Sequence, residues 1–168
     1  MSLVLQYARL TPSELARLRV LLVQDPDGAF DFTDEVSSDW PDEAPLAWRR
    51  GYGAGPHWAG LRFLLDRAGP PTVDLLTGGG QLTADEWGAA PPRLLTPADL
   101  AAGMRFWRAT PFPRLAGYFD PAAMNGVGPG RWAELTDAYE LLAQCHADLT
   151  EFLGAAADRG DAVVSWLS

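Results

Sequence analysis

The stretch "RWAELTDAYELLAQCHADLTEFLGAAADRGDAVVSWLS", residues 131–168, decides the fold, because it holds the longest helical pattern of the chain and an apolar segment after it. The pattern predicts a helix from about Arg131 to Ala157, ended by Gly160, and then a terminal strand, "DAVVSWLS". Apolar side chains alternate at steps of three and four along one helix face, which we expect to be buried; they are Trp132, Leu135, Tyr139, Leu142, His146, Leu149 and Leu153.

Two reactive residue types lie next to each other in this helix. Cys145 and His146 cannot form a catalytic pair as neighbours, because adjacent helical residues point about 100° apart. Cys145 lies beside the apolar face, which favours an inert core thiol. His146 lies on that face, so we expect a buried imidazole held by a hydrogen bond rather than by a metal, with a pKa below the usual value.

Capping signals place the upstream elements. Alternation over residues 2–10 predicts a strand, and "TPSE", residues 11–14, then supplies an N-cap, a first-turn proline and a capping box for a helix that stops near Asp25. "PPRLLTPADL", residues 91–100, predicts a short edge strand followed by a helix from Pro97 to about Ala109. A further helix is expected from His57 to Asp66, ending near Gly69 and Pro70.

One segment is conspicuously acidic. From Asp25 to Glu43 it holds eight carboxylates and no arginine: Asp25, Asp27, Asp31, Asp34, Glu35, Asp39, Asp42 and Glu43. Such a run is typical of a solvated surface, and we expect a loop with at most a short helix. Strands at both ends with long helices between them predict an α+β fold, in which helices cover one face of a small mixed or antiparallel sheet.

Composition limits the classes of function. The chain has 168 residues, which suits one domain over residues 1–168, and its formal charge is −9. All its basic residues are arginine, and a pI near 4.5 argues against sequence-independent binding to nucleic acid or to anionic lipid. A single cysteine fits a reducing cytoplasm, and the sequence contains no apolar run of membrane-spanning length.

"FDPAAMNGVGPGRW", residues 119–132, is rich in turn-forming residues just before the long helix. Asp120 is placed to cap a short turn that begins at Pro121, with Met124 as its apolar anchor. Trp132 then begins the buried helix face. We interpret the block first as a corner that directs the long helix and second as a binding loop.

Several motifs carry a family resemblance. "RLTPSEL" (9–15), "HWAGLRFLL" (57–65), "PPRLLTPADL", "FDPAAM" and the ending "AAADRGDAVVSWLS" (155–168) occur in the same order as in the YfbM-like family of small uncharacterised bacterial proteins, which the chain resembles over nearly its whole length. The family usually has an acidic-Lys-Ala-Trp approach to the second helix, where this chain has "GAGPHW". The resemblance implies a single α+β domain and supplies no activity or catalytic residues.

The charge and the absence of an assembled catalytic set favour a non-catalytic, cytoplasmic protein whose acidic surface binds a protein partner with a basic surface. We expect that surface on the long helix, at Asp137, Glu140, Asp148 and Glu151. We expect no cofactor, no metal, no nucleic acid and no membrane as partners, and a monomer or weak dimer.

The alternative is a small-molecule enzyme or ligand-binding protein. Its cleft would lie near His57, Trp58 and Asp120, with Arg131 and Trp132 beside them. His57 carries this hypothesis because it starts a helix after a glycine-rich approach, where solvent can reach it.

Overall fold

A computed structural model of the chain describes residues 3–41, 43–69 and 71–168. Three predictions fall partly outside the described residues. They concern Ser2 in the first strand, Asp42 in the acidic segment and Pro70 at a helix end.

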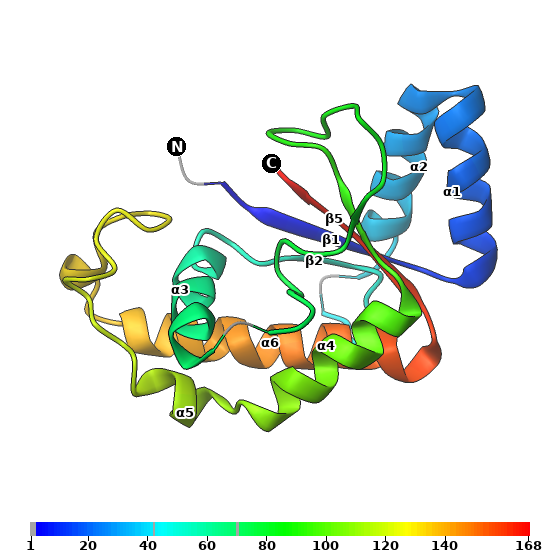
Figure 1. The fold of residues 1–168 in the computed structure, drawn as a ribbon. Helices are drawn as coiled ribbons and strands as arrows, with labels where there is room; N and C mark the ends of the chain where they lie inside the picture. Colours follow the sequence, from blue (N-terminus) through cyan, green and yellow to red (C-terminus); the bar gives the residue numbers. More distant parts are fainter. Residues whose placement is uncertain (1–2, 42, 70) are drawn as a thin grey trace.

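The two strands nearest the chain ends form the centre of a five-stranded antiparallel sheet (Figure 1), whose order is β2-β1-β5-β4-β3. β1 and β5 pair along their whole length, from Leu5 opposite Leu167 to Leu10 opposite Ala162. The strand predicted within "PPRLL" is present but is not at the edge, because the two-residue β3 pairs with its outer side. The strands are β1 (Leu5–Leu10), β2 (Gly51–Gly53), β3 (Gly80–Gln81), β4 (Arg93–Leu95) and β5 (Ala162–Leu167).

The described residues also form six α-helices and two short 3₁₀ turns, which confirms the α+β class. The helices are α1 (Pro12–Gln24), α2 (Pro26–Ser38), α3 (Trp58–Ala68), α4 (Pro97–Ala109), α5 (Phe112–Ala116) and α6 (Ala138–Arg159), and the turns are η1 (Leu46–Trp48) and η2 (Trp132–Glu134). None of these helices combines the length and the apolar character that crossing a membrane requires.

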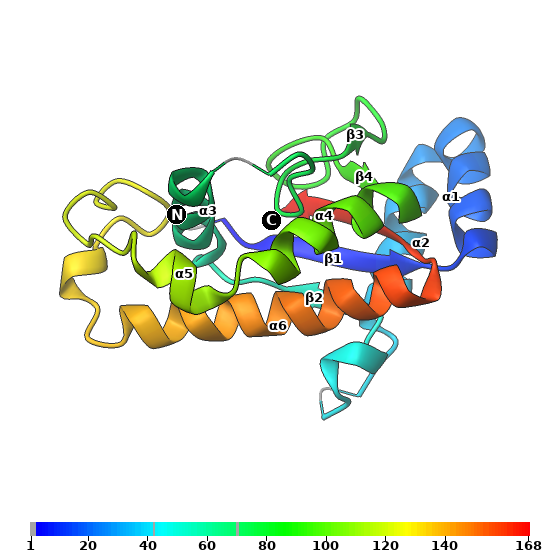
Figure 2. The same cartoon turned by 60° about the horizontal axis from the view of Figure 1, so that its bottom comes forward.

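Helices pack on both faces of the sheet, which corrects the expectation of one covered face. Successive strand residues point to opposite faces, so Val163 joins the larger core under α3, α4 and α6 while Val164 joins a smaller core under α1 and α2. Figures 1 and 2 show α6 running along the sheet and the α1–α2 pair lying apart from it. The sequence pattern of α1 and α6 gave no information on which face each would cover.

The capping box predicted at Thr11 is confirmed, and the helix start predicted at Thr96 also has one. The side chain of Thr11 accepts a hydrogen bond from the backbone N–H of Glu14, and Glu14 accepts one from the Thr11 N–H. Thr96 and Asp99 repeat this arrangement at the start of α4. Each box satisfies backbone donors that the first turn leaves unpaired, which explains why α1 and α4 begin where the sequence predicted.

The acidic segment was predicted wrongly, because residues 26–38 form a full helix, α2. Asp25 ends α1 and caps α2 by accepting a hydrogen bond from Gly28 N–H at 3.2 Å, and Pro26 occupies the first turn. Ala29, Phe32 and Thr33 are buried on one side of the helix, and the acids lie on its remaining surface. The apolar spacing therefore outweighed the high charge of the segment.

The long helix starts later than predicted, at Ala138, because Leu135 has an extended backbone (φ −83°, ψ 116°) and breaks it from η2. Trp132 lies in η2 and is still buried, so the apolar spacing continued across the break. Tyr139 is 43% exposed rather than buried, although its ring packs edge-on against Phe112.

The block at residues 119–132 forms the predicted corner. Asp120 Oδ1 accepts hydrogen bonds from the N–H groups of Ala122 and Ala123 at 3.1 Å each, and Met124 is fully buried. Trp132 Nε1 donates to the carbonyl oxygen of Val127 at 2.8 Å, and its ring packs closely over Gly60 in α3. The corner therefore joins the start of η2 to α3.

The predicted burial of His146 is confirmed. Its ring stacks on Trp107 with centroids 4.9 Å apart and the planes 9° from parallel. Burial lowers the pKa of His146, and a hydrogen bond with the backbone of Thr110 opposes that shift. Cys145 is also buried, which raises the pKa of its thiol to about 12, so the thiolate that a nucleophile requires is not populated near neutral pH.

Candidate binding cleft

Two of the four acids predicted as a partner surface on α6 are engaged by the protein's own chain. Asp148 accepts hydrogen bonds from the Tyr52 hydroxyl at 3.3 Å and from the Gln144 amide at 2.6 Å. Glu151 accepts the backbone N–H of Ala47 at 3.1 Å. These contacts hold the segment that contains η1 and β2 against α6.

Asp137 and Glu140 lie exposed at the first turn of α6, close to the second predicted site. His57 is the N-cap of α3 and packs edge-on against Trp132, with centroids 6.0 Å apart. Burial lowers the pKa of His57, and the charge of Asp137 opposes that shift. Trp58 donates its indole N–H to the carbonyl oxygen of Leu3 at 3.1 Å.

The structure therefore brings together His57, Trp132 and Asp137. Asp120 caps its own turn, and Arg131 forms an exposed ion pair with Glu134 at 2.5 Å. Four hollows formed by the described residues, near α2, β2, α3 and β4, are lined by other side chains. A ligand cleft around His57 stays a prediction.

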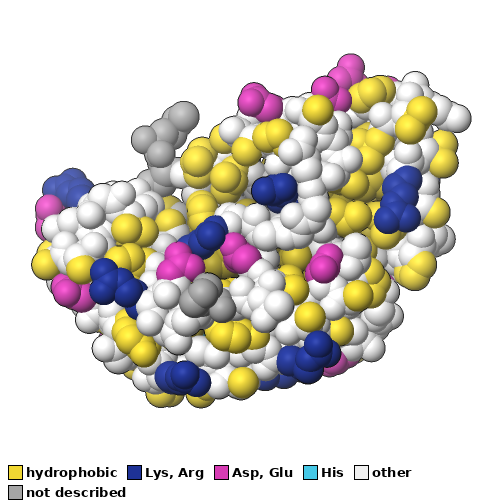
Figure 3. All heavy atoms as spheres, viewed as in Figure 1, with side chains coloured by type: hydrophobic (Ala, Val, Ile, Leu, Met, Phe, Trp, Pro, Cys, Tyr) yellow, Lys and Arg dark blue, Asp and Glu magenta, His cyan; other side chains and the backbone are white. Residues whose placement is uncertain are grey.

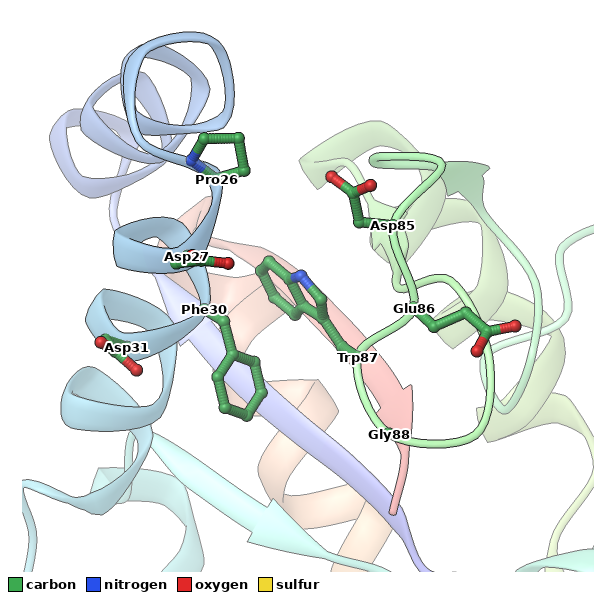
Figure 4. A pocket seen from close by; sticks show the side chains of 8 residues that line it. All are labelled: Pro26, Asp27, Phe30, Asp31, Asp85, Glu86, Trp87 and Gly88. Atoms are coloured by element: carbon green, nitrogen blue, oxygen red, sulfur yellow. The ribbon is translucent and has the colours of Figure 1, made fainter.

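A different cleft lies between α2 and the loop that joins β3 to β4, residues 82–92 (Figure 4). It has a volume of about 280 Å³ and is lined chiefly by acids and aromatic rings: Asp27, Phe30, Asp31, Asp85, Glu86 and Trp87. Figure 3 shows acidic side chains along the upper edge of the molecule, over this loop and the start of α2, with hydrophobic side chains in the hollow beneath them. We call this site the acidic–aromatic cleft.

The loop side of the cleft is held by contacts with β5. Ala89 N–H donates to the Leu167 carbonyl oxygen at 2.8 Å. Gly88 has a positive φ of 80°, and a Cβ atom there would lie 2.2 Å from the same carbonyl oxygen, so the close approach needs glycine. Trp87, one residue earlier, is thereby fixed beneath the acids Asp85 and Glu86.

Two aromatic rings, Phe30 and Trp87, form the floor, and Trp166 supports them from β5. Phe30 and Trp87 pack edge to face with centroids 5.4 Å apart, and Trp166 from β5 packs edge-on against both at 6.3 and 6.1 Å. Edge-to-face packing is a favourable arrangement of ring quadrupoles and gives the floor a defined geometry. The cleft therefore rests on packed side chains of the smaller core.

The charges of the cleft have no internal counterions. Asp27, Asp31, Asp85 and Glu86 form no ion pair with any arginine in the part of the chain that the structure describes. Asp27 and Asp31 are one helical turn apart on α2. In Figure 4 Asp27 points toward Trp87, with Asp85 on the loop across from it, whereas Asp31 lies on the outer side of α2 and Glu86 points away from the helix. Carboxylates this close repel one another, and a bound cation would relieve that repulsion.

The indole of Trp87 adds an unpaired donor. Trp87 is 4% exposed, and its Nε1 makes no hydrogen bond with the described residues, whereas the indole nitrogens of Trp58, Trp107 and Trp132 each have a partner. Figure 4 shows the nitrogen on the ring edge away from Phe30, toward Pro26 and Asp85. Trp87 Nε1 is not one of the enclosed atoms that lack a partner, so it reaches the surface of the cleft, where a ligand oxygen could accept its hydrogen bond.

A second hollow continues the cleft along α2. It has a volume of about 580 Å³, shares Phe30 with the cleft, and extends past Asp34 to the outer strand β2. Its lining includes one cation, Arg49, whose Nε already donates to the Ala44 carbonyl oxygen at 2.6 Å. The two hollows form a groove with acids of α2 along one side.

Sequence reasoning missed this site for identifiable reasons. Asp27 and Asp31 were counted within a solvated loop, although the capping pair Asp25 and Pro26 matched the signal that was recognised at Thr11 and Thr96. Trp87 had no distinguishing neighbours in the sequence. Its position beside α2 depends on the pairing of β4 with β5, which no local pattern gives.

The arrangement is suited to binding a cation and an adjacent hydrogen-bond acceptor. Within residues 3–41, 43–69 and 71–168, no group of three or more His, Cys, Asp or Glu side chains is placed to hold a metal ion. The cleft contains carboxylates and rings but neither histidine nor cysteine in its lining.

Comparisons with known proteins agree with the fold. A family model described as a domain of unknown function, DUF1877, matches residues 1–166. A crystal structure described as a protein of unknown function, YfbM from Escherichia coli, is similar with a TM-score of 0.62 and 18% identity, covering 98% of this chain and 99% of that one. Among curated proteins, none matches the sequence significantly. The resemblance that the motifs indicated is confirmed.

Proposed function

The chain belongs to the DUF1877 family, and we propose that this member is a non-catalytic protein that binds a basic segment of a protein partner in its acidic–aromatic cleft. The observation that carries the proposal is the position of Asp27 across Trp87 from Asp85, with Asp31 and Glu86 at the outer margins of the cleft and no ion pair to any of the four among the described residues. A set of carboxylates kept together without counterions favours a ligand that supplies positive charge.

The aromatic floor defines the kind of cation. A guanidinium or ammonium group can lie against an aromatic face while the surrounding carboxylates accept its hydrogen bonds. Arginine fits better than lysine, because its planar group both stacks on a ring and pairs with a carboxylate in a bidentate way. The volume of about 280 Å³ suits one such side chain.

The indole of Trp87 supports a peptide rather than a free cation. A guanidinium group has no acceptor for the Nε1 donor, whereas the backbone carbonyl of a peptide does. The adjoining hollow, with Asp34 on its α2 side, gives room for the residues that follow the bound arginine. The partner segment would therefore lie in an extended form along α2.

Net charge supports the same class of partner. The formal charge of −9 attracts a basic protein during diffusional encounter and repels nucleic acid and anionic lipid. We infer that the protein works in the cytoplasm, since its one cysteine is buried and free. We propose a monomer or weak dimer.

Fluorescence anisotropy with a labelled, arginine-rich peptide tests the proposal. The cleft variant combines Asp27→Asn with Asp31→Asn, and the control combines Asp137→Asn with Glu140→Gln, which removes the same charge from the exposed start of α6. We expect the cleft variant to weaken binding by at least about tenfold and the control by less than about threefold, because short-range pairs outweigh the general field.

A lysine-rich peptide of equal length and a glutamate-rich peptide complete the experiment. We expect the arginine peptide to bind most tightly and the acidic peptide not to bind. Equal weakening by the two double variants would show that only net charge matters and would contradict a role for the cleft. Failure of the unaltered protein to bind the arginine peptide at low salt would contradict the proposal as a whole.

A further inference from the structure

One row of polar side chains crosses the whole sheet on its α6 side. The strand register places Gln81 opposite Arg93, Arg93 opposite Ser165, Ser165 opposite Tyr7, and Tyr7 opposite Tyr52. Directly opposed residues of antiparallel strands point to the same face, with Cβ atoms about 5 Å apart. This face otherwise carries the larger apolar core, so the buried members of the row, Tyr7 and Ser165, call for partners, whereas Gln81 and Arg93 are exposed at the end of the row.

The tyrosines of the row have their partners, whereas the centre of the row does not. The Tyr7 hydroxyl donates to the Leu75 carbonyl oxygen at 3.2 Å, and the Tyr52 hydroxyl donates to Asp148. Ser165 is only 2% exposed, and its hydroxyl forms no hydrogen bond within the described part of the chain. Arg93 likewise has neither a carboxylate partner nor a side-chain hydrogen bond there.

A hollow of about 240 Å³ lies over these two residues. Arg93 and Ser165 contribute polar groups to it, while Leu5, Pro91 and Leu167 contribute apolar walls. Thr77 also lines it, but the Thr77 hydroxyl is already engaged by Asp74 and Arg62. The carboxylate of Asp74 pairs with Arg62 at 3.0 Å, so this neighbouring acid has its own cation and leaves Arg93 available.

We propose that this hollow binds a small organic carboxylate with a short apolar tail. The carboxylate pairs with the exposed Arg93 guanidinium, which has no ion pair among the described residues, and accepts a hydrogen bond from the Ser165 hydroxyl. The tail lies against Leu5, Pro91 and Leu167. The volume is below the range of about 300–1,000 Å³ usual for drug-sized ligands, which limits the tail to a few carbons.

The site is separate from the acidic–aromatic cleft in charge and in position. The cleft is open on the α2 side of β5, which carries Trp166, whereas Ser165 and its row face α6. The two sites would accordingly select ligands of opposite charge. Neither proposal depends on the other.

Sodium butanoate is the probe, with n-butanol and n-butylammonium as ligands of similar shape but different charge. We expect NMR titration of the intact protein to shift the backbone amides of Arg93, Ser165 and Leu167 with butanoate alone. Acetate should bind more weakly than butanoate because it lacks most of the tail. Inorganic phosphate should also bind more weakly, because it offers nothing to the apolar walls.

Two variants and one control assign the contacts. Arg93→Gln should weaken butanoate binding by at least about tenfold, since a charge-assisted pair is lost. Arg105→Gln changes an exposed arginine on α4 that has no ion pair among the described residues, and it should leave binding unchanged. Ser165→Ala should weaken binding several-fold without lowering the Tm, because the hydroxyl has no partner to lose in the free protein.

Three results would overturn the proposal. If butanol or butylammonium bound as tightly as butanoate, the site would not require an anion. If Arg93→Gln bound butanoate with unchanged affinity, Arg93 would not be the partner of the carboxylate. Phosphate binding as tightly as butanoate would remove the role of the apolar walls. Absence of amide shifts with butanoate in the unaltered protein would eliminate the site.

Discussion

The acids of α6 and those of α2 differ in what they contact. Asp148 and Glu151 of α6 accept hydrogen bonds from Tyr52 and Ala47, so they fasten another part of the chain to the helix. Asp27 and Asp31 of α2 instead border a cleft and form no ion pair within the described residues. The comparison teaches that the density of charge on a helix says little about its role, which depends on the groups that face it.

The same contrast holds for the two cores beneath these helices. The larger core under α6 includes the corner tryptophan Trp132 and the stacked His146, both enclosed by packed side chains. The smaller core under α2 ends in Phe30 and Trp87, whose rings form the floor of a hollow, with Trp166 packed against both. The α6 side therefore stabilises the fold, and the α2 side offers a surface.

The largest expected effect is on the α6 side, at the corner. Trp132→Ala should lower the free energy of unfolding by about 3–5 kcal/mol, because it leaves a cavity between η2 and Gly60 of α3. Denaturant unfolding measures it. Trp48→Ala, which truncates a tryptophan that is 60% exposed, is the control and should cost less than about 1 kcal/mol. Equal effects of the two substitutions would contradict a structural role for the corner.

A smaller effect is expected where the cleft loop meets β5. Gly88→Ala should destabilise the protein by about 1–3 kcal/mol, because the new Cβ combines an unfavourable φ with an overlap onto the Leu167 carbonyl oxygen. Gly126 has a similar φ of 90° but open space around an added Cβ, so Gly126→Ala measures the cost of the unfavourable φ alone. We expect only Gly88→Ala to weaken binding of the arginine-rich peptide. Unchanged peptide binding by Gly88→Ala would show that this loop does not take part in the proposed function.

Paired alanine substitutions on the two helices test the comparison itself. Asp148→Ala should cost about 1–2 kcal/mol, because the Tyr52 hydroxyl loses its acceptor. Asp31→Ala should leave stability unchanged or raise it by up to about 0.5 kcal/mol, since alanine favours the helix and relieves repulsion with Asp27. Thermal unfolding of both variants shows whether each substitution lowers or raises the stability of the protein. A stabilising Asp148→Ala or a destabilising Asp31→Ala would reverse the roles assigned to the helices.

The smallest effect is a pH dependence on the α6 side. The folded pKa of His146 is lowered by burial, so the unfolded chain binds more protons below its reference pKa of about 6.5. The contribution of His146 is therefore complete above about pH 6.5 and declines as the pH falls toward the folded pKa. His146→Gln should flatten this part of the stability profile.

His57→Gln serves as the comparison for that profile. The pKa of His57 is lowered too, but its ring is only half-buried, so its removal should flatten the acid-side decline less than the removal of His146. A larger change from His57→Gln would place the more strongly buried imidazole at the start of α3 and contradict the described packing.

Local signals predicted the α6 side of the molecule well. The spacing of Leu142, His146 and Leu149 gave the buried face of α6, and the N-cap Thr96 before Pro97 gave the start of α4. On the other face, the capping box at Thr11 likewise gave the start of α1. These features involve residues within a few positions of one another. They depend on helix geometry, which a sequence expresses directly.

The α2 side was predicted poorly, for two different physical reasons. The helix itself was missed because its charge was given more weight than the spacing of Ala29, Phe32 and Thr33, so that signal was present in the sequence. The cleft was missed because Trp87 meets Phe30 only after β4 has paired with β5. Contacts set by strand pairing between distant segments have no local pattern.

The most direct test of the acidic–aromatic cleft is the NMR signal of the Trp87 indole N–H during titration with the arginine-rich peptide. The Nε1 donor lacks a partner among the described residues and lies in the cleft, so binding should supply a carbonyl acceptor and move this signal downfield. The indole signals of Trp107 and Trp132, whose donors already have partners, should stay in place. Peptide binding that leaves the Trp87 signal unmoved, or that shifts the Trp132 signal instead, would contradict the account.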